Sequence, residues 1–173
     1  ARRVIQLGEA PWRVTVSGAP ALDHLARLKM MDRVELSTLV EMALAESPLL
    51  VTMHPVTLQS SEASSQIEEL LCALSHIDTP IIITRHNADT NHSQMLERIE
   101  QFAATRSHVR FVKNLGTRAY FSLMKIASAM VGNSSSGIIE AASFQLPVVN
   151  IGIRQQGRPQ SGNVIDTECR ADM

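Results

Sequence analysis

The residues with the clearest chemical potential in this chain are three consecutive serines, Ser134–Ser136, which lie between Gly132-Asn133 and Gly137. They follow an apolar run that ends at Gly132, and Gly137 opens an apolar helical pattern. A strand that turns into a helix in this way leaves backbone N–H groups and hydroxyls at the helix start, where they attract phosphate. Glu140 follows about one turn later, where a carboxylate can accept hydrogen bonds from a ribose diol. The alternative is a plain serine N-cap with a capping box from Ser136 to Glu140.

A histidine, His54, closes a second apolar run, Leu49–Met53, and is followed by Pro55. At a strand end, a group that titrates near neutral pH can bond a phosphate or transfer a proton. The alternative is a histidine that bonds only the local backbone.

Two more polar stretches follow apolar runs. Thr84–Asp89 contains Asn87, whose amide can recognise a hydroxyl or amide group, and Gly152–Arg158 contains Arg154, which suits bidentate contact with phosphate. A solvated turn and a flexible surface loop are the alternatives. Ligands of open α/β sheets bind beyond the carboxyl ends of strands. The shared position of all four stretches therefore argues for one binding site more strongly than any stretch alone.

The elements that must position these residues alternate between short strands and helices. Apolar runs predict strands at Val14–Ser17, Leu49–Met53, Ile81–Thr84, Val109–Val112, Ala129–Gly132, Val148–Ile151 and Val164–Asp166. Helical spacing predicts helices at Ser61–His76 (capped by Ser60 or Ser61), Ser93–Ala104, Thr117–Ala127 and Gly137–Phe144. This alternation predicts a doubly wound, Rossmann-like α/β fold with a parallel sheet covered on both faces. The last strand has no covering helix after it, which suggests a truncated chain or a disordered tail; the alternative is that the fold simply ends there.

Composition excludes several classes of protein. The net charge is −1 and aromatic residues make up 3% of the chain, so neither a nucleic acid nor a membrane surface is an expected partner. No apolar run reaches the roughly 18 residues that a membrane span needs. Cys72 and Cys169 lack metal-ligand spacing and are expected to be free thiols in the cytoplasm.

Four segments together resemble one known family, the hydrolysing UDP-N-acetylglucosamine 2-epimerases of bacterial sialic acid synthesis. They are GEAPWRVTVSGAPALDHL at Gly8–Leu25, HPVT at His54–Thr57, GNSSSGIIEAASFQLPVVNIGIRQQGR at Gly132–Arg158, and NVID at Asn163–Asp166. The resemblance implies two facing Rossmann-like domains in the glycosyltransferase-B arrangement. Residues 14–173 would be the UDP-binding C-terminal domain and residues 1–13 the hinge-side connecting segment. The N-terminal domain and the final helix would be absent.

The resemblance also implies roles for individual residues. His54 would be the catalytic histidine near the UDP phosphates, and the UDP group would be bound by Asn87, Leu115, Tyr120, Ser134, Ser135, Gly137, Glu140 and Arg154. No metal or cofactor is implied, and the full-length protein is expected to be a homo-oligomer. Loss of UDP from UDP-N-acetylglucosamine, followed by addition of water, would give N-acetylmannosamine.

Three other functions stay open. A sister epimerase acting on UDP-N,N'-diacetylbacillosamine would differ mainly in the absent domain. A glycosyltransferase of the same architecture is disfavoured by the RQxGR loop at Arg154–Arg158. A nucleotide-binding module without catalysis is what the chain is expected to be on its own, because the carboxylates that handle the sugar C2 proton would lie in the absent domain.

Overall fold

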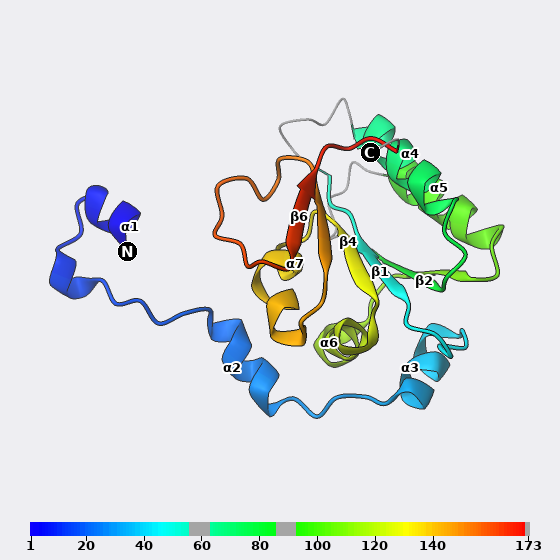
Figure 1. Ribbon diagram of the computed structural model, residues 1–173, viewed down its shortest axis with the longest axis horizontal. Helices are drawn as coiled ribbons and strands as arrows, with labels where there is room; N and C mark the ends of the chain where they lie inside the picture. Colours follow the sequence, from blue (N-terminus) through cyan, green and yellow to red (C-terminus); the bar gives the residue numbers. More distant parts are fainter. Residues whose placement is uncertain (56–62, 86–92, 172–173) are drawn as a thin grey trace.

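The core of the protein is a six-stranded parallel sheet, seen in a computed structural model that describes residues 1–55, 63–85 and 93–171 (Figure 1). The strand order is β3-β2-β1-β4-β5-β6. The strands are β1 (Leu49–Thr52), β2 (Ile81–Thr84), β3 (Val109–Val112), β4 (Ala129–Gly132), β5 (Val148–Ile151) and β6 (Val164–Thr167). This order is that of a dinucleotide-binding Rossmann fold, and it reverses direction between β1 and β4. The predicted doubly wound fold is confirmed.

Helices cover both faces of the sheet (Figure 1). One face carries α4 (Ala63–Leu74) and α5 (Ser93–Ala104), and the other carries α3 (Arg33–Val40), α6 (Gly116–Ile126) and α7 (Ser135–Ile139). Because successive strand residues point to opposite faces, Leu49 and Val51 pack on the α4–α5 side and Leu50 on the α6 side. Burial on both sides is the reason that β1 and β2 are apolar without alternation.

The predicted helix Gly137–Phe144 is two elements. Helix α7 begins at Ser135, and a 3₁₀ helix, η3 (Ala141–Phe144), follows it. Ser134 caps α7 by accepting a hydrogen bond of 3.3 Å from the Ser136 N–H. Glu140 comes after the last residue of α7, so the capping-box alternative for Ser136 and Glu140 is wrong. The predicted caps Ser60 and Ser61 of α4 lie outside the described residues.

The N-terminal region was predicted least well. Helix α1 (Arg2–Gln6) and the 3₁₀ helix η1 (Pro11–Arg13) lie away from the sheet, and α2 (Pro20–Arg27) leads back toward it (Figure 1). The predicted strand Val14–Ser17 is wrong. Val14 has an extended backbone, but the segment pairs with no strand within the described residues. None of the helices α1, α2 and α3 was predicted.

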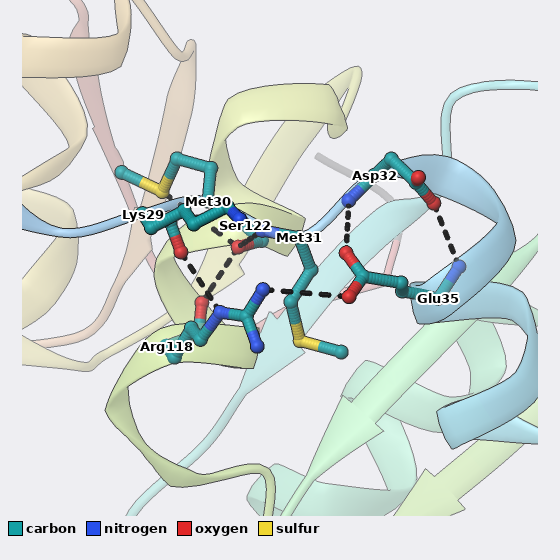
Figure 2. A network of polar contacts seen from close by, with 7 residues as sticks. All are labelled: Lys29, Met30, Met31, Asp32, Glu35, Arg118 and Ser122. Carbon is teal, nitrogen blue, oxygen red and sulfur yellow. Dashed lines mark hydrogen bonds and ion pairs between the residues drawn. The ribbon is translucent and has the colours of Figure 1, made fainter.

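A polar network fastens the connection between α2 and α3 to the outer side of α6 (Figure 2). The Arg118 side chain donates to the Lys29 carbonyl at 2.8 Å, and the Met31 N–H donates to the Ser122 hydroxyl at 2.8 Å. Asp32 and Glu35 form a reciprocal capping box at the start of α3. These contacts hold α6 from outside, which matters because the start of α6 lines the cleft described next. No helix in the described ranges is long and apolar enough to cross a membrane.

Candidate functional site

A cleft of about 750 Å³ opens at the carboxyl ends of the central strands. It lies where the strand order reverses between β1 and β4, the usual ligand position in open α/β sheets. Its walls come from the ends of β1 and β2, the β3–α6 connection, the start of α7 and the loop after β5. The lining residues are Thr52, His54, Thr84, Arg85, Val112, Lys113, Asn114, Leu115, Gly116, Thr117, Tyr120, Phe121, Ser134, Ser135, Ser136, Glu140 and Arg154.

Most of the site residues suggested by the sequence meet in this cleft. They are His54, Leu115, Tyr120, Ser134, Ser135, Glu140 and Arg154. Gly137 does not line the cleft. It is buried in α7, and a Cβ atom there would lie 2.9 Å from a methyl carbon of Val148, so the close packing of α7 on β5 requires glycine. Asn87 lies outside the described residues.

The sequence interpretation missed Asn133, a fully buried residue at the end of β4. Its side chain makes two hydrogen bonds to the backbone of His54: it accepts from the His54 N–H at 2.7 Å and donates to the His54 carbonyl at 2.8 Å. Its own carbonyl accepts from Arg154 Nη1 at 2.9 Å and from Gln155 Nε2 at 2.7 Å. The signal available in the sequence was an asparagine directly after a strand-ending glycine, which reads equally well as a turn.

Gly132 makes this contact possible. Its φ is 133°, and a Cβ atom at this position would lie 2.0 Å from the Thr52 carbonyl oxygen. No side chain fits that space. The ends of β1 and β4 can therefore approach closely enough for the Asn133 N–H to donate to the Thr52 carbonyl at 3.1 Å.

Hydroxyl groups form the floor of the cleft, another feature that the sequence interpretation missed. The Thr52 and Thr84 hydroxyls lie 2.6 Å apart and both residues are buried. The Thr84 hydroxyl also lies 3.3 Å from the Val51 carbonyl, and the Tyr120 hydroxyl lies 3.5 Å from that of Thr52. Threonines at the ends of adjacent strands thus place a polar floor beneath a largely apolar sheet.

The charges in the cleft are arranged for an anion. Arg85 and Arg154 line it, together with Lys113, whose ammonium group is already paired with Glu100 outside the cleft, while Glu140 is the one carboxylate among the lining residues of this cleft. Burial lowers the pKa of Arg154, and the neighbouring positive charge of Arg158 adds to that effect. Two guanidinium groups that repel each other gain from a bound anion. The chain as a whole carries a net charge of −1, so this positive character is local.

The pKa of Glu140 is shifted in the opposite direction to that of Arg154. Burial raises the pKa of its carboxyl, against hydrogen bonds from its own backbone and from the Ser136 side chain that act to lower it. Its Oε2 atom is buried without a hydrogen-bond partner. A buried carboxylate oxygen of this kind is stabilised by a ligand that donates a hydrogen bond to it.

The cleft therefore combines groups for a phosphate with a group for a diol. Ser134, Ser135 and Arg154 offer hydroxyls and a guanidinium, and Glu140 offers an acceptor. Helix α7 is only five residues long, so its dipole contributes less than the sequence suggested. Within the described ranges, no three His, Cys, Asp or Glu side chains are grouped so that they could hold a metal ion.

Comparison with protein families gives a match along the chain. The model of a family described as UDP-N-acetylglucosamine 2-epimerase matches residues 1–173.

Curated relatives cover almost the whole chain. It is 38% identical to the GDP/UDP-N,N'-diacetylbacillosamine 2-epimerase (hydrolyzing) of Campylobacter jejuni over 96% of this chain and 44% of that protein. It is 34% identical to polysialic acid biosynthesis protein P7 of Escherichia coli over 95% of this chain and 42% of that protein. A UDP-N,N'-diacetylbacillosamine 2-epimerase (hydrolyzing) of Legionella pneumophila is 33% identical over 99% of this chain and 45% of that protein. The chain thus spans slightly less than half the length of these relatives.

Solved structures share the fold at low identity. An S. aureus MnaA–UDP co-structure matches with a TM-score of 0.66 and 15% identity, over 86% of this chain and 40% of that chain. A Methanocaldococcus jannaschii UDP-GlcNAc 2-epimerase in complex with UDP-GlcNAc and UDP matches with a TM-score of 0.67 and 14% identity, over 99% of this chain and 48% of that chain.

Proposed function

This chain belongs to the UDP-N-acetylglucosamine 2-epimerase family, and from that membership we propose that it holds the UDP group in a hydrolysing UDP-sugar 2-epimerase. The observation that carries the proposal is the meeting of His54, Ser134, Ser135, Glu140 and Arg154 in one cleft at the strand-order reversal. These side chains come from loops that are distant in sequence. Their convergence places donors and a cation that suit a phosphate close to an acceptor that suits a diol.

We assign each group a part of UDP. The diphosphate lies against Ser134, Ser135 and Arg154, whose donors and positive charge suit it. The ribose diol donates to Glu140, which satisfies the buried Oε2 atom. The uracil lies along the start of α6, near the Leu115 backbone and Tyr120, and Asn87 contributes a further contact.

The proposed reaction begins with cleavage of the bond between sugar C1 and the diphosphate oxygen, whose electron pair leaves with UDP. A carboxylate of the other domain removes the C2 proton, which leaves an unsaturated C1–C2 sugar. Water then adds its hydroxyl at C1, and a proton returns to C2 from the opposite face. The balance is UDP-sugar plus water to UDP plus the 2-epimeric sugar. This chain accelerates the first step because its hydrogen-bond donors and positive charges stabilise the negative charge that develops on the diphosphate. His54 is the catalytic residue that contacts this developing charge.

The remaining expectations about the whole protein stay predictions. Residues 14–173 are proposed as the UDP-binding C-terminal domain, with residues 1–13 as the connecting segment to a second domain. The full-length protein is proposed to be a cytoplasmic homo-oligomer. This chain alone is proposed to bind UDP without turning over UDP-sugars, because the C2 carboxylates belong to the other domain.

Two sugars are candidates for the substrate. The family description names N-acetylglucosamine, for which the product would be N-acetylmannosamine. The names of the Campylobacter and Legionella relatives specify N,N'-diacetylbacillosamine. Assays of the full-length protein with both UDP-sugars, following UDP release and the product sugar separately, distinguish the two candidates.

Calorimetry on this chain tests the binding proposal. We expect UDP to bind, weakly because this chain is proposed to supply only one side of the interdomain cleft, and more tightly than GDP or ADP. The GDP comparison is the informative one, because the name of the Campylobacter relative includes both GDP and UDP. Equal binding of all three nucleotides would contradict the assignment of uridine. Release of N-acetylmannosamine by this chain alone would contradict the proposal that the C2 carboxylates belong to another domain.

A further inference from the structure

Asn133 connects three loops of the cleft that are far apart in sequence. Through its side chain it holds the His54 backbone in the loop after β1, 79 positions away. Through its carbonyl it holds Arg154 and Gln155 in the loop after β5, 21 and 22 positions away. It immediately precedes Ser134, the N-cap of α7. One residue therefore joins the loops that carry the histidine, the serines and the arginine.

The geometry of this connection is specific. A primary amide that both donates to and accepts from one residue's backbone fixes that backbone in position and in direction, as a strand partner does. The Asn133 carbonyl has two lone pairs, and two side-chain donors occupy it. Asn133 is 0% exposed, so water cannot replace these bonds when they are broken.

We infer that Asn133 is a positioning residue that sets His54 and Arg154 together relative to the diphosphate, an inference that rests on the proposed function. Asn133 itself does not line the cleft. It acts through the two residues that do. If its side chain is removed, the His54 loop loses its two hydrogen bonds to the residue whose carbonyl holds Arg154, although the Asn133 N–H still donates to the Thr52 carbonyl. His54 and Arg154 then contribute less to ligand binding, although both are still present.

If Asn133 had a purely structural role, its replacement would have a different effect. The chain contains a second buried asparagine that serves as a comparison. Asn150 on β5 is 2% exposed, and its amide donates to Asp166 of the neighbouring strand at 2.7 Å. It does not line the cleft and has no described contact with His54 or Arg154. Asn150→Ala is therefore the control for the loss of a buried amide as such.

The test is a set of double-mutant cycles for UDP binding, measured by calorimetry on this chain. His54→Ala, Arg154→Ala and Glu140→Ala are each introduced into wild type, into Asn133→Ala and into Asn150→Ala. We expect Asn133→Ala alone to weaken UDP about tenfold, within the range of coupled neighbours. In that background His54→Ala should have little further effect, Arg154→Ala a reduced effect, and Glu140→Ala its full effect. In Asn150→Ala all three should keep their wild-type effects.

Asn133→Asp provides a second variant if Asn133→Ala does not fold. The introduced carboxyl keeps the acceptor for the His54 N–H but, when ionised, repels the His54 carbonyl. When protonated it restores the donor. Because the position is fully buried, the pKa of the introduced carboxyl should lie above the ordinary Asp value. UDP affinity relative to wild type at the same pH should therefore recover as the pH falls from about 8 to about 5.

Each outcome decides the inference. Full additivity of His54→Ala with Asn133→Ala, or an Asn133→Asp deficit that does not change with pH, would overturn it while the proposed function stands. Failure of the wild-type chain to bind UDP would overturn the proposed function and this inference with it.

Discussion

The two walls of the cleft are built differently. The β4 wall, made of the loops after β1, β4 and β5, carries His54, Ser134 and Arg154 on a backbone that Asn133 holds from behind. The α6 wall, made of Arg85 and Lys113–Thr117, is mostly exposed. Its described internal bond is from the Gly116 N–H to Asn114 Oδ1 at 3.0 Å, and Lys113 pairs with Glu100 outside the cleft.

This difference indicates which part of the ligand each wall is suited to bind. Charge stabilisation needs donors that are already in place when charge develops, because reorganisation during the reaction costs free energy. The β4 wall meets that requirement. The α6 wall offers exposed backbone groups at a helix start, which suit the flat edge of a base. Four predictions test this division, from the largest expected effect to the smallest.

The largest effect is expected for His54→Ala in the full-length protein. A group that strengthens its contact as charge builds on UDP lowers kcat more than it raises KM when it is removed. We expect a loss of about 10²–10⁴-fold in kcat, and little recovery in His54→Gln, which keeps a donor but cannot carry the charge. Lys113→Ala on the α6 wall is the control and should change kcat by less than about tenfold. A well-folded His54→Ala enzyme with near-normal kcat would remove His54 from the mechanism.

A pair of glycine substitutions compares the walls by stability. Gly132 in the β4 wall has a φ of 133° and no room for a Cβ atom, whereas Gly116 in the α6 wall has a φ of 65° and nothing within 4 Å. Gly116→Ala should cost about 1–2 kcal/mol for its left-handed conformation. Gly132→Ala should cost more than about 4 kcal/mol, because strain is joined by a clash with a buried backbone. Urea unfolding measures both, and equal costs would mean that the close approach of β1 and β4 is not required.

Glu140→Ala tests whether the carboxylate recognises the ribose. The loss of a hydrogen bond to a charged acceptor costs about 1.5–3 kcal/mol, so the affinity for UDP should fall by about 10- to 100-fold. Inorganic pyrophosphate, which has no diol, should bind within about threefold of its wild-type affinity, a change of well under 1 kcal/mol. Calorimetry with the two ligands gives both values. If Glu140→Ala weakened the binding of UDP and of pyrophosphate equally, Glu140 would instead have a structural role in the α7–η3 turn.

The smallest effect concerns stability and pH. Burial raises the pKa of Glu140 above its ordinary 4.5, so the folded chain binds this proton more tightly than the unfolded chain. That contribution to stability is present below about pH 4.5 and is lost as the pH rises through the raised value. Glu140→Gln, which cannot ionise, should therefore raise Tm at pH 7 by about 1–3 °C. The gain should disappear near pH 4 in thermal unfolding followed by circular dichroism; a gain that stays constant with pH would contradict the assignment.

Local pattern was sufficient for four of the strands and for the position of the cleft. Ile81–Thr84, Val109–Val112, Ala129–Gly132 and Val148–Ile151 have the predicted bounds, because each is a short run in which apolar residues predominate. Polar residues directly after such strands necessarily meet at one edge of a parallel sheet. The same reasoning failed at Val14–Ser17, because β-branched residues favour an extended backbone but form a strand only beside a partner.

The sequence by itself determined the α/β class, the ends of the central strands and the chemical types of the groups at the cleft. The tertiary structure alone decided how those groups are held. Asn133 looks like a turn residue, yet the order of the strands places it between His54 and Arg154, where a buried amide must satisfy its donor and acceptor on whichever backbone lies nearest. That requirement is non-local, since its partners are 79 and 21 positions away and no local pattern encodes their proximity.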